Sequence, residues 1–77
     1  MAVARTLALL PAGQSARITA LYLDGAKRAR LQELGFLPGS EVTALRESPF
    51  GDPVAYAVLD TVIALRRSDA ARIEIES

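Results

Sequence analysis

The chain has 77 residues, which suffice for one small domain and leave little room for the machinery of an enzyme. It contains no cysteine and no histidine, so disulfides, zinc ribbons, iron–sulfur clusters and histidine-based catalysis are excluded within it. Nine basic residues balance nine acidic ones, and this net charge of zero disfavours a nucleic-acid partner while leaving weak self-association unopposed.

The first residues carry few signals of regular structure. Residues 1–5 are expected to form a frayed tail, and Thr6 is expected to cap a short helical turn that ends at Pro11. The apolar stretch before Pro11 is shorter than the roughly 7–15 residues of a secretion signal. The longest apolar run, residues 54–59, is far below the roughly 18 residues that span a bilayer. We therefore expect a cytoplasmic protein without direct membrane insertion.

Alternating polar and apolar residues predict a first strand over residues 15–23, with Ala16, Ile18 and Ala20 facing inward. A helix is then predicted over about residues 26–34. Gly35 fits the left-handed position that follows a helix, where glycine alone avoids a steric penalty.

The next segment reads as a turn, a strand and a loop. Pro38 and Gly39 suit the two central positions of a type II turn, which leads into a strand over residues 41–47. Residues 48–53 are expected to form a loop, because they include two prolines and a glycine. Within this loop, Gly51 and Pro53 are expected to shape the turns.

Three further strands complete the pattern. They are predicted over residues 54–59, 62–66 and 72–76, with a tight helical turn at residues 68–71 before the last one. Five short strands with one short helix between the first two favour a closed, strongly bent sheet, because small open sheets have exposed edges. We predict a mainly β fold, an SH3-like barrel that forms a single domain over residues 1–77.

The sequence offers no catalytic constellation. Serine and threonine nucleophiles lack a histidine base, and the five glycines are scattered rather than gathered in a phosphate-binding loop. The nine carboxylates are dispersed, and oxygen ligands alone do not favour a selective ferrous site. We therefore predict no enzyme, no cofactor and no metal site, and expect a binding module.

The best candidate for a partner-binding residue is Phe50, which lies in a loop whose backbone cannot join the sheet. Phe36 and Leu37 are expected on the same rim, where they would form a small apolar patch. The alternative is that Phe50 folds back and plugs one end of the barrel. Polar residues assigned to the same surface are Asp52, Lys27 and Arg28, although nearby acidic residues favour a solvated helix face for the two cations.

Three segments, residues 30–40, 51–54 and 63–75, together resemble the FeoA family in order and spacing. The resemblance implies an SH3-like fold, no catalytic activity and a role in ferrous iron uptake. It implies one partner, the permease FeoB, whose cytoplasmic N-terminal part is a GTPase domain. This GTPase domain is the expected binding partner. Many relatives carry a glycine near the turn where this chain has Asp60 and Thr61, and the tolerance of aspartate for left-handed geometry is expected to preserve that hairpin.

The resemblance leaves a second function open. Related domains are attached to metal-dependent repressors of the diphtheria-toxin-repressor type, so the alternative is a metal-responsive regulatory domain. The family also implies transition-metal binding, whereas the lack of histidine and cysteine predicts no tight, selective ferrous site here.

Overall fold

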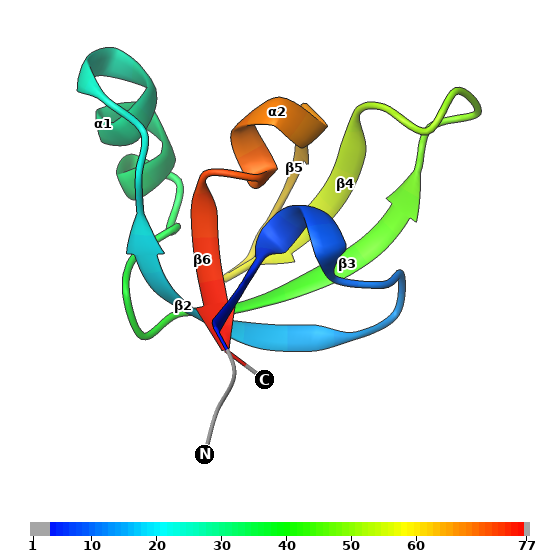
Figure 1. The fold of residues 1–77 in the computed structure, drawn as a ribbon, viewed down its shortest axis with the longest axis horizontal. Coiled ribbons are helices and arrows are strands. Elements are labelled where there is room, and N and C mark those ends of the chain that lie inside the picture. Colours follow the sequence, from blue (N-terminus) through cyan, green and yellow to red (C-terminus); the bar gives the residue numbers. More distant parts are fainter. Residues whose placement is uncertain (1–3, 77) are drawn as a thin grey trace.

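Six antiparallel strands form one strongly bent sheet in the computed structural model, which describes residues 4–76 (Figure 1). The strands follow the order β1-β6-β2-β3-β4-β5 across the sheet. A short helix lies between β2 and β3, which correspond to the first two of the five predicted strands. The elements are β1 (Ala4–Thr6), the 3-10 turn η1 (Leu7–Leu9), β2 (Ser15–Leu21), α1 (Gly25–Glu33), β3 (Glu41–Glu47), β4 (Val54–Val58), β5 (Thr61–Leu65), α2 (Arg67–Ala70) and β6 (Ile73–Glu76).

The additional strand is β1, which lies at one edge of the sheet and pairs with β6. Ala4 lies opposite Glu76 and Thr6 lies opposite Glu74, so the tail predicted for residues 1–5 is too long by two residues. Residues 1–3 lie outside the described part of the chain. Thr6 also makes no side-chain capping hydrogen bond to η1, so its predicted role is wrong. A strand of three residues is too short for alternation to reveal it.

Strand β2 departs from the predicted alternation after its midpoint. Its register against β6 shifts between Ile18 and Ala20, where an irregularity inserts one extra residue. Beyond this point Leu21 and Leu23 are buried, while Ala20 is only partly buried. The inward face therefore changes from even to odd residue numbers within a single strand.

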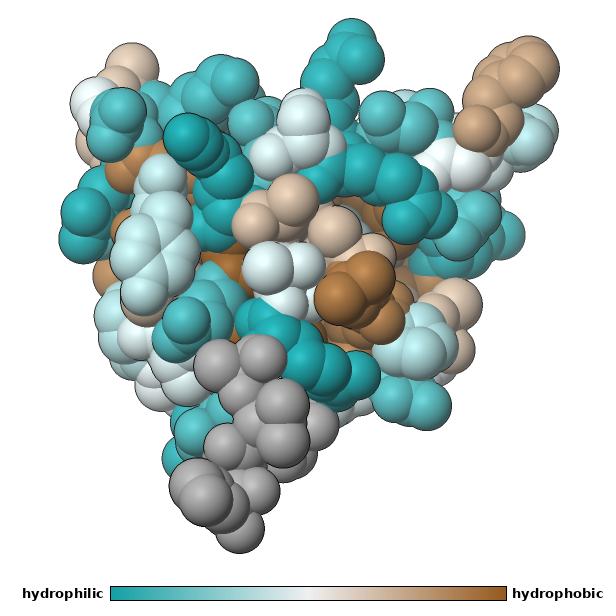
Figure 2. Space-filling view, in the orientation of Figure 1, coloured by the Kyte–Doolittle hydropathy of each residue, from teal (hydrophilic) through white to brown (hydrophobic). Residues whose placement is uncertain are grey.

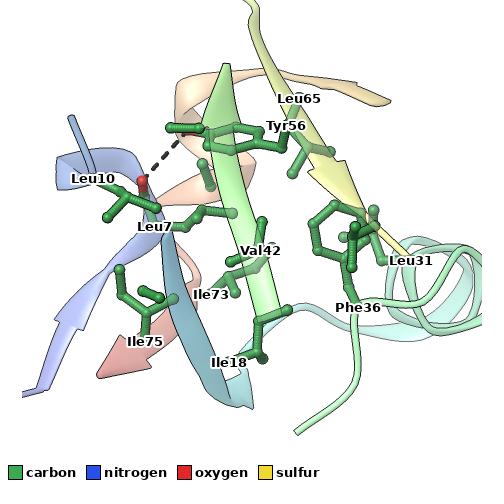
Figure 3. Close-up of a cluster of buried hydrophobic side chains, with 14 of the residues drawn as sticks. Leu7, Leu10, Ile18, Leu31, Phe36, Val42, Tyr56, Leu65, Ile73 and Ile75 are labelled. Atoms are coloured by element: carbon green, nitrogen blue, oxygen red, sulfur yellow. Dashed lines mark hydrogen bonds between the residues drawn. The ribbon is translucent and has the colours of Figure 1, made fainter. Parts of the chain in front are cut away.

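The core is mainly aliphatic, with the rings of Phe36 and Tyr56 among its largest side chains, and lies inside the bend of the sheet (Figure 3). Alternate residues of β4 are buried, as are Ile73 and Ile75 of β6, which confirms the alternation predicted for both strands. Tyr56 in β4 is nearly fully buried, and its hydroxyl donates to the carbonyl oxygen of Leu7 at 3.4 Å. This contact fastens η1 to β4.

The segment between α1 and β3 contains two predicted turns, and both are present. Gly35 has a φ of +109°, its N–H donates to Gln32, and the N–H of Phe36 donates to Leu31 at 2.9 Å. These two bonds define a Schellman motif at the end of α1. Gly39 has a φ of +94°, and the N–H of the residue that follows it donates across the turn to Leu37 at 2.9 Å.

The hairpin between β4 and β5 differs from the expectation. Its central residues are Leu59 and Asp60, and the residue with positive φ is Leu59, at +53°. The tolerance attributed to aspartate is therefore not what allows this turn. No helix among residues 4–76 has the length and apolar character needed to cross a membrane.

Candidate protein-interaction site

The loop between β3 and β4 closes on itself through its own backbone. The N–H of Ser48 donates to the carbonyl oxygen of Pro53 at 3.0 Å, and the N–H of Gly51 donates to the carbonyl oxygen of Ser48 at 2.9 Å. Gly51 has a φ of +82°, which a residue with a side chain rarely adopts. Gly51 and Pro53 thus shape the loop as predicted, and the tip of the loop is tight.

Arg67, the first residue of α2, connects this loop to the rest of the barrel. Its backbone N–H donates to Asp52 Oδ1 at 3.0 Å, and its Nε–H donates to the carbonyl oxygen of Gly51 at 2.7 Å. Its Nη2 also forms an ion pair with Glu47 Oε1 at 2.6 Å. Two of these bonds are charge-assisted donations from one planar guanidinium group, an arrangement that lysine cannot reproduce. Arg67 therefore holds the loop in place.

Phe50 lies at the tip of this loop and is 95% exposed. Figure 2 shows a hydrophobic side chain projecting from the surface where Figure 1 places the loop. The alternative in which Phe50 plugs the barrel is therefore wrong. An aromatic ring that contacts almost nothing in its own molecule, on a loop fixed by Arg67, is an arrangement suited to insertion into a partner.

The other predicted members of the apolar patch lie elsewhere. Phe36 is fully buried, because the Schellman motif turns its side chain into the core beside Leu31 (Figure 3). Leu37 is 43% exposed, but it follows Gly35, which lies against Val58 and Leu59 at the β4–β5 turn, whereas Phe50 lies in the β3–β4 loop. The expected patch of Phe36, Leu37 and Phe50 is therefore wrong.

The three polar residues predicted for this surface also lie in two different places. Asp52 accepts the hydrogen bond from Arg67 and so stabilises the Phe50 loop from within. Lys27 and Arg28 lie on α1, where the Nζ of Lys27 forms an ion pair with Asp69 Oδ1 at 3.1 Å. Arg28 is exposed and forms no ion pair with any residue in the described range.

The surroundings of Arg67 also affect a buried phenol. Burial raises the pKa of Tyr56 above its ordinary value of 10.0, and the positive charge of Arg67 partly opposes this rise. Tyr56 and Arg67 line a shallow groove of about 230 Å³ that also includes Leu9 and Glu47. The groove therefore includes a tyrosine, Tyr56, whose phenol stays neutral at physiological pH.

Within residues 4–76, no three acidic side chains gather in a way that could hold a metal ion. The expectation that this chain has no tight ferrous site stays a prediction. Arg67 is the residue that sequence reasoning missed. Its contacts lie 15 to 20 residues away along the chain, and the only local signal was its position between a strand and a helical turn.

Comparisons with known proteins agree with this geometry. A model of the FeoA domain matches residues 5–77. The chain is 40% identical over 70 residues to the Fe(2+) transport protein A/Fe(2+) transporter FeoB fusion protein of Porphyromonas gingivalis. The match covers 91% of this chain and 8% of that protein, so the chain corresponds to a small part of the relative.

Solved structures give the same result. FeoA from Chlorobium tepidum has a TM-score of 0.88 at 32% identity, covering 92% of this chain and 68% of that one. A zinc complex of Stenotrophomonas maltophilia FeoA, described as an SH3 domain protein, has a TM-score of 0.78 at 36% identity, covering 91% and 87%. A manganese-dependent transcriptional repressor shares the fold, with a TM-score of 0.86 at 18% identity, covering 100% and 43%.

The bent six-stranded sheet with its inserted helix is thus a small SH3-like domain. The match over nearly the whole chain then assigns its family: the chain belongs to the FeoA family, whose members are small accessory domains of ferrous iron transport.

Proposed function

We propose that this chain is a non-enzymatic accessory protein of ferrous iron uptake that acts in the cytoplasm by docking on the GTPase domain of FeoB. The observation that supports this proposal is the Porphyromonas gingivalis relative, in which a matching domain and a FeoB transporter are fused in one chain. Fusion keeps two partners at high effective concentration, which is useful where they act together.

The Phe50 loop is the surface we assign to this docking. Phe50 provides one rigid aromatic side chain with few rotatable bonds, so that its immobilisation on binding costs little conformational entropy. Arg67 and Asp52 fix the loop before the partner arrives, which lowers the cost of ordering it. Exposed aromatic residues on preordered loops are typical binding hot spots.

A calorimetric titration of the isolated GTPase domain tests the proposal, run with GDP and with a non-hydrolysable GTP analogue. Phe50→Ala is expected to weaken binding by about 2 kcal/mol, roughly thirtyfold. The same substitution should change the free energy of unfolding by no more than about 0.5 kcal/mol, because the ring is exposed.

Tyr22→Ala is the matched control, because Tyr22 is an exposed aromatic residue on another part of the surface, beside Thr6 and Glu74. It should bind as the wild type does. Absence of binding by the wild-type chain in both nucleotide states would reject the proposal, whereas equal binding by Phe50→Ala would reject this loop as the docking surface.

The alternative is a metal-responsive regulatory domain. It is supported by similarity of fold alone, since the repressor match is 18% identical. It predicts that Mn²⁺ or Fe²⁺ changes the oligomeric state of the chain. Sedimentation with and without these ions separates this alternative from docking.

A further inference from the structure

We propose that the groove between α1 and the free edge of β5 binds an extended peptide segment, apolar and acidic in character, as an added strand. This surface shares no residue with the Phe50 loop, and the inference does not depend on the proposed function. It rests on the pairing of β5, on the composition of that strand, and on the shape and charge of the groove beside it.

Strand β5 lies at one end of the strand order and has β4 as its neighbour. Across the described range, no backbone hydrogen bond other than those of the β4–β5 ladder involves residues 61–65. In an antiparallel pair, every second residue directs its N–H and C=O away from the partner strand. The outer edge of β5 therefore presents free donors and acceptors to an incoming strand.

The sequence of β5 contains none of the residues that usually keep an edge strand from pairing with another chain. Natural edge strands are commonly short, or contain lysine, proline or other charged residues that prevent pairing with another chain. The opposite edge follows this rule, because β1 has three residues and includes Arg5. Strand β5 reads Thr-Val-Ile-Ala-Leu over five residues, without charge or proline, so it is open to strand addition.

A groove of about 290 Å³ runs between this edge and α1. Its apolar walls include Leu31 and Leu34 from the helix and Ile63 from the strand. A strand added to β5 would direct alternate side chains toward α1, into these walls. Peptide-binding domains that add a strand use the same two parts, in which the sheet edge supplies affinity and the lined groove supplies side-chain selection.

Two cations at the rim of the groove define the charge of the occupant. Lys27, Arg30 and Asp69 all line it, and Asp69 pairs with Lys27, so that the unpaired charge of the described lining is that of Arg30. Arg30 forms no ion pair with any residue of the described chain, which leaves a positive charge for an acidic side chain. A second copy of this chain fits less well, because its β5 reads Thr-Val-Ile-Ala-Leu and brings no carboxylate to meet Arg30.

The probe is the synthetic peptide acetyl-Glu-Val-Thr-Val-Glu-amide, titrated into ¹⁵N-labelled protein. We expect saturable shifts of the amide signals of residues 61–65 and of α1, together with slower hydrogen exchange in β5. A peptide with lysine in place of glutamate should bind at least about tenfold more weakly, because it meets the cations of the rim. Two further peptides are N-methylated at alternate residues, one at the odd positions and one at the even positions. The peptide whose methyl groups replace the N–H groups that face β5 should lose binding, and the other should keep it.

Arg30→Glu tests the rim on the protein side and should weaken the binding of the acidic peptide at least about tenfold. Arg28→Glu is the matched control, because Arg28 lies on the same helix but does not line the groove. It should bind within about twofold of wild type, since exposed charges at a distance are screened by salt. Both variants change exposed side chains and should fold normally.

Three results would overturn the inference. The first is binding that survives N-methylation at the odd positions and at the even positions, and the second is a set of shifted amides that excludes β5. The third is concentration-dependent self-association through β5 in the absence of peptide, which would make a second copy the occupant.

Discussion

Leu59 adopts a backbone conformation that residues with side chains rarely occupy, with a φ of +53°. Its side chain is 74% exposed, so little burial compensates for this strain. The side chain lies against Gly35, where an added Cβ would come within 2.7 Å of Leu59 Cδ1. Gly35 therefore serves both the end of α1 and the close approach of this turn.

Leu59→Gly is expected to stabilise the protein by about 0.5–1 kcal/mol. A left-handed conformation costs a residue with a side chain roughly 1–2 kcal/mol, and glycine avoids this cost. Glycine also has a larger conformational entropy in the unfolded state, which offsets part of the stabilisation. Urea denaturation measures the change. Asp60→Gly, in the same turn but without positive φ, is the control and should be neutral or destabilising. A less stable Leu59→Gly protein would show that the leucine contact outweighs the backbone strain.

Glycines at special backbone positions were predictable residue by residue, because a turn or a helix end needs φ values that glycine alone adopts without strain. Gly35 and Gly39 confirm this. The exposure of aromatic residues was not predictable in the same way. Phe36 and Phe50 both follow local turn signals, yet one is buried and the other projects into solvent. Phe36 follows the Schellman motif that ends α1 and packs in the core, whereas Phe50 lies at the tip of a loop closed between Ser48 and Pro53, beyond the ends of β3 and β4.

At the scale of elements, Arg67 is the positioning residue of the Phe50 loop. Arg67→Lys keeps the charge and the backbone bond to Asp52 but loses the planar donation to Gly51 and Glu47. We expect a loss of about 1 kcal/mol in unfolding free energy, together with weaker binding of the GTPase domain.

The control for Arg67→Lys is Arg66→Lys, which changes an exposed neighbour and should alter stability by less than about 0.5 kcal/mol. Hydrogen exchange at the Gly51 amide gives an independent measure of loop order. Unchanged exchange in Arg67→Lys would show that the loop holds its shape without the guanidinium group.

The long and regular elements were predictable, and the irregular ones were not. Strands β4 and β6 alternate cleanly because in each of them one face is buried and the other is more exposed to solvent. The register shift in β2 has no such signal, because it follows from pairing with β6, more than 50 residues away in sequence. For the candidate site, the loop and the exposed Phe50 were predicted, but the anchor Arg67 was not. Its place beside the loop follows from the register of the β4–β5 ladder, in which Val54 lies opposite Leu65.

For the whole molecule, the buried phenol of Tyr56 predicts a loss of stability at alkaline pH. Burial raises its pKa in the folded state above 10.0, so folding keeps the phenol protonated. This contribution is fully present below pH 10.0 and is lost as the pH rises from there toward the folded-state pKa. Thermal melts above neutrality measure it.

Tyr56→Phe should remove the part of the stability loss at alkaline pH that comes from the buried phenol. Tyr22→Phe should retain that loss, because Tyr56 is still present. Identical alkaline profiles for wild type and Tyr56→Phe would show that the phenol does not control stability in this range.

The central claim is that the chain docks on the FeoB GTPase domain through the Phe50 loop. The most direct test is an amide map of the ¹⁵N-labelled chain titrated with the unlabelled GTPase domain. We predict shifted or broadened signals that cluster at the amides of Ser48, Phe50, Gly51, Asp52 and Arg67, with β1 unaffected. A map without changes, or with changes confined to residues 61–65 and α1, would contradict the claim.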